Sequence, residues 1–141
     1  MADFLSVADV DPEALASILD TAARIKTDPG LVSAALKGLQ VGLFFEKPSA
    51  RTRVSTEVGC NQLGAHPVVL RGEEVGLGSR EAVEDVARVF DRYLDVLAFR
   101  VYHHSDLETL AEYAAAPVIN LLSDVEHPCQ ALADLQTLAE H

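Results

Sequence analysis

The stretch VGLFFEKPSARTR, residues 41–53, contains the pattern that decides the fold. It opens with an apolar run over residues 41–45 and closes with a polar cluster over residues 49–53. A short, nearly continuous apolar run is typical of a strand buried on both faces. The run over residues 117–122, followed by the cluster His127-Pro128-Cys129-Gln130, repeats this arrangement. Because open α/β sheets hold ligands at the carboxyl ends of their strands, we expect both clusters to lie at one edge of a sheet.

Helical and strand patterns alternate along the rest of the chain. We expect strands over residues 40–45, 67–70, 95–100 and 117–122, and helices beginning near residues 12, 51, 83, 105 and 128. Ser105 and Glu108 have the spacing of a capping box, and the glycine-rich residues 71–79 are expected to form a mobile loop. Apolar strands that alternate with helices indicate an α/β domain with a four-stranded parallel sheet covered on both faces.

The composition argues for one folded domain and against two classes of partner. The chain has 141 residues, 49% of them hydrophobic, and its 11 basic and 22 acidic residues give a net charge of −11. This charge disfavours binding to nucleic acid or to an anionic membrane surface. A small anion remains compatible, because one arginine at about 4 Å contributes roughly 4 kcal/mol at an effective dielectric constant near 20.

The cysteines and histidines indicate a reducing compartment and no metal cofactor. The only cysteines are Cys60 and Cys129, too few for a disulfide framework or a zinc knuckle. The pair His103-His104 lacks the carboxylate–histidine spacing of a metal site. Neither a signal peptide nor an apolar run of about 18 residues is visible, so we expect a cytoplasmic protein without a membrane span.

The first cluster is a candidate phosphate site. A helix N-terminus offers free backbone N–H groups, Ser49 and Thr52 add hydroxyl donors, and the guanidinium of Arg51 can grip two phosphate oxygens. Arg53 should point elsewhere, and the glycines of a Walker loop are missing. The alternative is an exposed, capped helix start whose arginines pair with surface carboxylates.

The second cluster and one strand-end arginine are candidates for the chemistry beside that phosphate. His127 can donate to a developing oxyanion or move a proton, and the amide of Gln130 suits a neutral, amide-like group. Arg100 ends an apolar strand and would add a second cation, or else form an ordinary surface ion pair. His127 could equally bind backbone at a helix start, and Cys129 could be a small core residue.

Together the two clusters resemble the transcarbamylases. Residues 44–53, FFEKPSARTR, are similar to that family's carbamoyl-phosphate loop, usually S-T-R-T-R, and residues 127–135, HPCQALADL, are similar to its second signature. Glu46-Lys47, the run NLLSD at residues 120–124 and the H-P-C-Q form resemble the ornithine carbamoyltransferases in particular. The resemblance runs from about residue 4 to residue 141.

The resemblance implies a role for each matching residue. The catalytic residues would be Arg51, Thr52, Arg100 and His127. The carbamoyl-phosphate-binding residues would be Ser49, Ala50, Arg51, Thr52, Arg100, His127, Pro128, Cys129 and Gln130. The reaction would transfer the carbamoyl group to the δ-amine of ornithine, giving citrulline and phosphate, in a homotrimer that needs no metal or organic cofactor.

Three departures from the family pattern bear on this reading. Ala50 stands where a threonine is usual: little is lost if this position contributes mainly its backbone N–H, and phosphate binding weakens if a hydroxyl contact matters. Gly76 stands where the family often has a glutamine or histidine that reaches into a neighbouring subunit, and Arg80 or Glu74 are the candidates to replace it. The chain is also about half as long as family members, so residues 1–141 would be the carbamoyl-phosphate-binding domain, without the ornithine-binding domain.

Other functions remain open at the level of the sequence. The acceptor amine could be aspartate, putrescine or an acylated ornithine instead of ornithine. The 141-residue chain could be a non-catalytic anion-binding or oligomerisation module, inactive by itself. A phosphate-binding regulator of unrelated ancestry would require both signatures to be coincidental.

Overall fold

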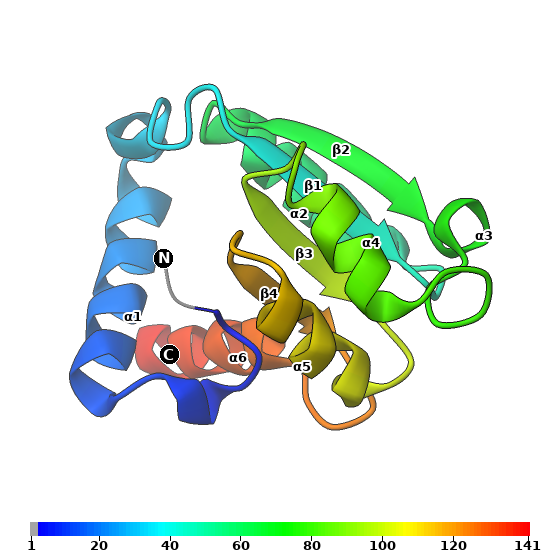
Figure 1. The fold of residues 1–141 in the computed structure, drawn as a ribbon. Helices are drawn as coiled ribbons and strands as arrows, with labels where there is room; N and C mark the ends of the chain where they lie inside the picture. The colour runs from blue at the N-terminus through cyan, green and yellow to red at the C-terminus, as the bar shows by residue number, and fades with distance from the viewer. Residues whose placement is uncertain (1–2) are drawn as a thin grey trace.

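The protein is a three-layer α/β domain built on a four-stranded parallel sheet, as the alternating sequence pattern predicts (Figure 1). The computed structural model describes residues 3–141. The strands lie in the order β2-β1-β3-β4. They are β1 (Gln40–Phe45), β2 (His66–Arg71), β3 (Val96–Arg100) and β4 (Val118–Leu122). The α-helices are α1 (Pro12–Thr27), α2 (Ala50–Gln62), α3 (Gly72–Val75), α4 (Val83–Phe90), α5 (His104–Tyr113) and α6 (Pro128–Glu140), and the 3₁₀ helices are η1 (Val7–Asp9) and η2 (Pro29–Val32).

Helices cover both faces of the sheet because the central strands alternate their side chains between two cores. On one face Phe44 and Phe99 stack at 4.8 Å between ring centroids and pack with residues of α4 and α5, such as Val86 and Leu107. On the other face Leu43 packs in a cluster with residues of α2 and α6, including Cys60 and Cys129. The period-two alternation of a strand therefore places α4 and α5 opposite α2 and α6 (Figure 1).

The N-terminal segment extends the sheet beyond β4. The backbone N–H of Phe4 donates to the carbonyl of Val118 at 2.8 Å, and the N–H of Asn120 donates to the carbonyl of Phe4 at 2.9 Å. Helix α1 then lies beside α6, where Lys26 Nζ is 2.6 Å from Glu140 Oε2. The segment around Phe4 thus covers the outer edge of the sheet, and α1 packs against the last helix.

Two local predictions are wrong, and in both cases tertiary contacts decide the outcome. The expected loop over residues 71–79 contains the short helix α3, and Val75 and Leu77 are buried against the core. The expected capping box is also absent, because α5 begins at His104 and its N-cap residue, His103, makes no side-chain cap. The carboxylate of Asp124, in the loop after β4, caps α5 instead.

Candidate functional site

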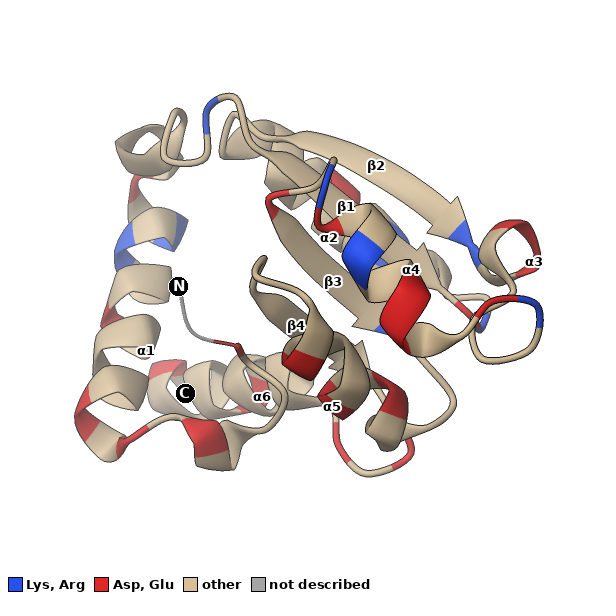
Figure 2. Ribbon diagram, in the orientation of Figure 1, with Lys and Arg blue, Asp and Glu red and all other residues tan. Residues whose placement is uncertain are grey.

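The candidate site lies at the carboxyl ends of β1 and β3, which are neighbours in the sheet. The helix that follows β1 covers one face of the sheet, and the helix that follows β3 covers the other (Figure 1). Such a reversal leaves a crevice in which α/β proteins bind ligands. Figure 2 shows basic residues at the carboxyl ends of β2 and β3, although the chain as a whole is acidic. These strand-end arginines supply local positive charge to the site, although Glu73 and Glu74 of α3 lie close to Arg71 at the same edge.

Arg100 joins the end of β3 to the start of α2. Its Nη1 donates to Ser49 Oγ at 3.2 Å and to Thr52 Oγ1 at 3.4 Å. Ser49 is the N-cap residue of α2, but its side chain makes no capping hydrogen bond. The first backbone N–H groups of a helix have no partner within the helix, so they remain donors at this end of α2. Two hydroxyls, one guanidinium and a helix N-terminus consequently converge, as the sequence predicts for an anion site.

His127 faces the same cluster from the start of α6. Burial lowers its pKa below the ordinary value, the positive charge of Arg100 lowers it further, and Asp134 acts in the opposite direction. His127 Nδ1 and Arg100 Nε are buried and have no hydrogen-bond partner among the described residues. A neutral imidazole beside a guanidinium can donate to an oxyanion, and the two unpaired nitrogens are groups that a polar ligand would satisfy.

The remaining residues of the second cluster are divided between core and surface. Pro128 is buried in the first turn of α6, and Cys129 Sγ donates to the carbonyl of Asn120 at 3.6 Å. Burial raises the pKa of the Cys129 thiol, so this thiol is a packed group with no sign of nucleophilic activation. The side chain of Gln130 is exposed, and its Nε2 donates to Asp134 Oδ1 at 2.9 Å. In this conformation the Gln130 amide lies along α6, and the structure does not bring it to Arg100.

The two arginines at the start of α2 have different surroundings. Arg51 is exposed and makes neither an ion pair nor a side-chain hydrogen bond among residues 3–141. Arg53 lies 3.5 Å from Glu57 across one helical turn, which agrees with the expectation that it points elsewhere. The neighbouring Ala50 is exposed and begins the helix. Arg51 therefore has a free guanidinium at the helix end, where a phosphate could be bound from solvent.

A hollow of about 460 Å³ opens beside this cluster, between the carboxyl ends of β1 and β2. Ser49 and Ala50 line it together with Arg53, Arg71 and Glu73, but Thr52, Arg100 and His127 do not. Arg71 lies 3.8 Å from Glu73, so its charge is partly compensated. The polar cluster at β1 and β3 fits the predicted chemistry better than the hollow does, because it holds the buried unpaired donors.

The backbone conformation at residue 76 explains why this residue is a glycine. It ends α3 with φ of 67°, in the left-handed region. A Cβ at this position would lie 2.7 Å from Cβ of Arg80, whose guanidinium donates to the carbonyl of Glu74. A side chain at position 76 would therefore be strained and obstructed, and the backbone here is built around glycine.

Asn120 and Glu46 were named from the sequence only as part of the resemblance, with no predicted role in supporting the site. Asn120 is fully buried in β4, and its Nδ2 donates to the carbonyl of Leu5 at 2.9 Å. Glu46 Oε2 accepts from the N–H of Tyr102 at 2.6 Å and so ties the end of β1 to the loop after β3. A polar residue in the apolar strand 118–122 and an acid directly after an apolar strand were the available signals.

Two kinds of site are absent over residues 3–141. No group of three or more His, Cys, Asp or Glu side chains has the arrangement of a metal site there. None of the helices in this part of the chain combines the length and the apolar character that a membrane span requires.

The fold and the cluster define a doubly wound α/β domain with a cationic site at its topological switch point. The family profile described as "Aspartate/ornithine carbamoyltransferase, carbamoyl-P binding domain" matches residues 2–140. The chain therefore belongs to the aspartate/ornithine carbamoyltransferase family, and it corresponds to the carbamoyl-phosphate-binding domain of that family. The resemblance of the two sequence clusters to the transcarbamylases is confirmed.

Individual relatives agree with this assignment. Ornithine carbamoyltransferase from Hyperthermus butylicus is 47% identical, over 98% of this chain and 45% of that protein. The structure of ornithine carbamoyltransferase from Pyrococcus furiosus superposes with a TM-score of 0.94 at 44% identity, over 99% of this chain and 45% of that chain. An N-acetyl-L-ornithine transcarbamylase solved with carbamyl phosphate and N-succinyl-L-norvaline has a TM-score of 0.90 at 35% identity, over 100% of this chain and 48% of that chain. This chain thus spans about half the length of the relatives it matches.

Proposed function

We propose that this chain supplies the carbamoyl-phosphate site of an ornithine carbamoyltransferase. The observation that carries the proposal is the pair of hydrogen bonds from Arg100 to Ser49 and Thr52. His127 lies close enough to Arg100 that the charge of the arginine lowers the pKa of the imidazole. The phosphate of carbamoyl phosphate would lie at the N-terminus of α2, held by Ser49, Thr52, Arg51 and the backbone N–H of Ala50. A helix end and two guanidinium groups together favour a dianionic group.

The carbonyl of the ligand would lie between Arg100 and His127. Attack by the δ-amine of ornithine forms the new C–N bond and moves the carbonyl π electrons onto oxygen, where the two side chains donate hydrogen bonds. Collapse of this intermediate breaks the bond to the phosphate oxygen, and the amine nitrogen loses its proton. The products are citrulline and phosphate, and Arg51 with the helix end already neutralises the leaving group.

The carbamoyl amide would be recognised from the start of α6. The backbone near Pro128 and Cys129 can accept its N–H groups, and Gln130 can join after a rotation that exchanges Asp134 for the ligand. The choice of ornithine over aspartate or putrescine rests on the H-P-C-Q form of residues 127–130 and on relatives named ornithine carbamoyltransferase. An acylated ornithine is the next candidate, because an N-acetyl-L-ornithine transcarbamylase is also a close structural neighbour.

The same proposal includes the pathway, the cellular location, the oligomeric state and a second domain. Arginine metabolism follows from ornithine as acceptor, and a cytoplasmic, reducing location suits two cysteines that are both free thiols. The homotrimer follows from the family resemblance, and Val54 and Val58, one turn apart on α2 and 60% and 48% exposed, are apolar side chains that a neighbouring subunit could cover. A second domain, beyond residues 1–141, would bind the amino acid, and the 141-residue chain would not turn over by itself.

Calorimetric titration of carbamoyl phosphate into the chain tests the proposal. We expect saturable binding that the Arg51→Ala variant weakens about 10- to 100-fold, because a hydrogen bond to a charged group contributes roughly 1.5–3 kcal/mol. The matched control is Arg88→Ala on α4, where the guanidinium pairs with Asp85. Equal binding by wild type and Arg51→Ala, or no binding by a folded wild-type chain, would contradict the proposed site.

Citrulline formation is measured separately from the binding of carbamoyl phosphate. With carbamoyl phosphate and ornithine both present, we expect no citrulline above the uncatalysed rate from the 141-residue chain. Citrulline formation at the rate of a full-length relative would refute the need for a second domain.

A further inference from the structure

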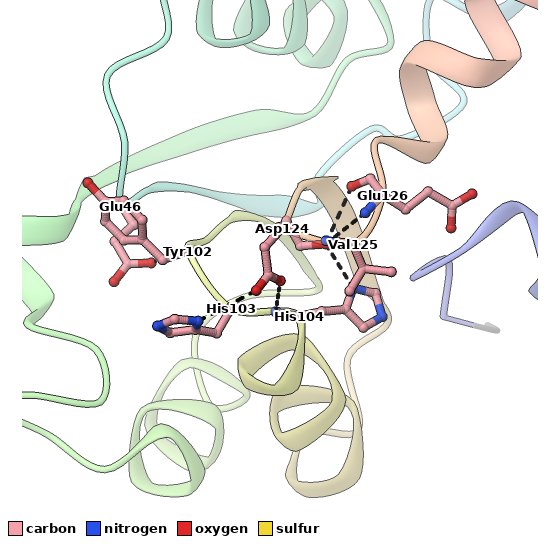
Figure 3. A network of polar contacts seen from close by, with 8 residues as sticks. Glu46, Tyr102, His103, His104, Asp124, Val125 and Glu126 are labelled. Carbon is pink, nitrogen blue, oxygen red and sulfur yellow. Dashed lines mark hydrogen bonds and ion pairs between the residues drawn. The ribbon is translucent and has the colours of Figure 1, made fainter.

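Two loops carry the reactive side chains of the proposed site, and a set of contacts outside that site connects them. One loop leaves β3 just after Arg100, and the other, residues 123–127, ends at His127. Asp124 of the second loop contacts His103, at the end of the first loop, and His104, the first residue of α5, as Figure 3 shows. Ser123 of the second loop contacts the His104 side chain. We call these four residues the loop clamp.

Asp124 caps a helix to which it is not connected in sequence. Its Oδ1 accepts from the backbone N–H of His104 at 2.8 Å, at the first turn of α5. His103, the N-cap residue of that helix, provides no side-chain cap. The second carboxylate oxygen lies 3.6 Å from His103 Nδ1. The N–H of His104 is the main reason that the pKa of Asp124 lies below its ordinary value, so the carboxylate is charged while it caps α5.

Ser123 connects the same two loops and shapes the turn that leads to His127. Its Oγ lies 2.8 Å from His104 Nδ1 and accepts from the N–H of Glu126 at 3.3 Å. The N–H of Ser123 donates to the carbonyl of Glu126 at 3.0 Å. The turn therefore closes on itself directly before His127. The loop clamp positions it relative to α5, and Asn120 Nδ2, which donates to the carbonyl of Glu126 at 3.3 Å, holds it to β4.

The loop after β3 is also held from its other side. Glu46 accepts from the N–H of Tyr102, and Lys47 Nζ lies 4.2 Å from the centre of the Tyr102 ring. These contacts fix this loop to β1, whereas the residue 123–127 loop is tied to α5 through Asp124 and Ser123. Loss of the Asp124 contacts would therefore loosen the residue 123–127 loop relative to α5, while the Arg100 side stays in place and Glu126 keeps its contacts with Val7 and Asn120.

We propose that Asp124 is a positioning residue, whose carboxylate ties the β4–α6 loop to α5 and thereby holds His127 against Arg100. This inference rests on the proposed carbamoyl-phosphate site and adds a residue that does not touch the ligand. Asp124 acts only through the placement of His127, so its removal should change the environment of that imidazole before any ligand is added.

NMR titration of the histidine imidazoles in the ligand-free chain tests this directly, with the His127→Gln variant to assign the resonance. In Asp124→Ala we expect the pKa of His127 to rise toward its ordinary value, because the ring moves away from Arg100 and from its buried surroundings. Loss of a negative charge by itself would lower that pKa, so an increase can come only from lost position. Asp124→Asn keeps an oxygen acceptor for the His104 N–H, so the pKa of His127 should not rise in this variant, and the lost charge can only lower it.

Asp91→Ala is the matched control. Asp91 Oδ1 accepts from the N–H groups of Ala115 and Ala116 at 2.8 and 2.7 Å, at the opposite end of the strands. Its removal should lower thermal stability without changing the titration of His127. If Asp124→Ala does not fold, Asp124→Glu keeps the charge but displaces the carboxylate, and it should raise the pKa of His127 in the same way.

Binding of carbamoyl phosphate separates this inference from the function on which it rests. We expect Asp124→Ala to weaken binding about 3- to 10-fold and Asp124→Asn to leave it unchanged. If the wild type binds no carbamoyl phosphate, the proposed function fails, and the titration still decides whether Asp124 positions His127. An unchanged or lowered pKa of His127 in folded Asp124→Ala and Asp124→Glu would overturn the inference.

Discussion

Replacement of Arg100 by alanine should remove the connection on which the proposed site depends. The guanidinium of Arg100 donates to Ser49 and Thr52, and its charge lowers the pKa of His127. A charge-assisted hydrogen bond contributes about 1.5–3 kcal/mol, and each 1.4 kcal/mol is a factor of ten in affinity. We therefore expect Arg100→Ala to bind carbamoyl phosphate about 10- to 100-fold more weakly, and the pKa of His127 to rise while burial keeps it below its ordinary value.

The assay combines calorimetry with NMR titration of the imidazole. Arg100→Lys separates charge from geometry: it retains a cation, so the pKa of His127 should stay low, but it loses the planar fork and binds the ligand less tightly than wild type. Arg88→Ala removes an arginine that pairs with Asp85 and lies over the ring of Tyr113, and it should change neither quantity. An Arg100→Ala chain that is folded, binds normally and titrates normally at His127 would refute this reasoning.

Three further predictions concern the scaffold. Gly76→Ala should lower the free energy of unfolding by at least about 1–2 kcal/mol in a denaturant titration, because its φ is positive and Arg80 obstructs a Cβ; an unchanged midpoint would contradict this. Asn120→Ala should lower the free energy of unfolding by about 1–3 kcal/mol in the same measurement, since the carbonyl of Leu5 loses its donor from the buried Asn120, and a neutral effect would show that this bond is dispensable. The pKa of His127 is lowered on folding, so the unfolded chain binds more protons and the free energy of unfolding should fall as pH decreases below about 6.5. His127→Gln should lose less stability than the wild type between pH 7.5 and 5, and an identical pH profile would exclude His127 as the source of the loss.

The strands of the central sheet were predictable because their burial leaves a simple pattern. Residues 40–45 were expected as a strand and form β1 with the same bounds, since an apolar run closed by a polar cluster suits few other structures. The convergence of Ser49, Thr52, Arg100 and His127 also followed, because the carboxyl ends of neighbouring parallel strands meet at one edge. These predictions required only local pattern and topology.

The predictions that failed depend on contacts between distant segments. Nothing near His103 shows that Asp124, 21 residues further along the chain, supplies the cap of α5, so Ser105 and Glu108 looked like the helix start. The short helix α3 forms in a glycine-rich segment because the side chain of Val75 reaches the core.

The direction in which individual side chains point could not be predicted from the sequence either. Gln130 is in the predicted motif, yet its amide bonds Asp134 instead of facing Arg100. Val54 and Val58 lie one turn apart on α2, and the structure leaves both largely exposed, with Cys60 as the buried residue of the helix. A helix pattern identifies a face, but it does not say whether the partner lies within the same chain.

Backbone amide NMR mapping of carbamoyl phosphate on the chain tests the central claim most directly. The account predicts saturable shifts concentrated at residues 49–53, at Arg100 and at residues 127–130, at the carboxyl ends of β1, β3 and β4. Shifts concentrated on α1 and the outer face of α6, or no shifts from a folded chain at millimolar ligand, would contradict the assignment of this edge of the sheet as the carbamoyl-phosphate site.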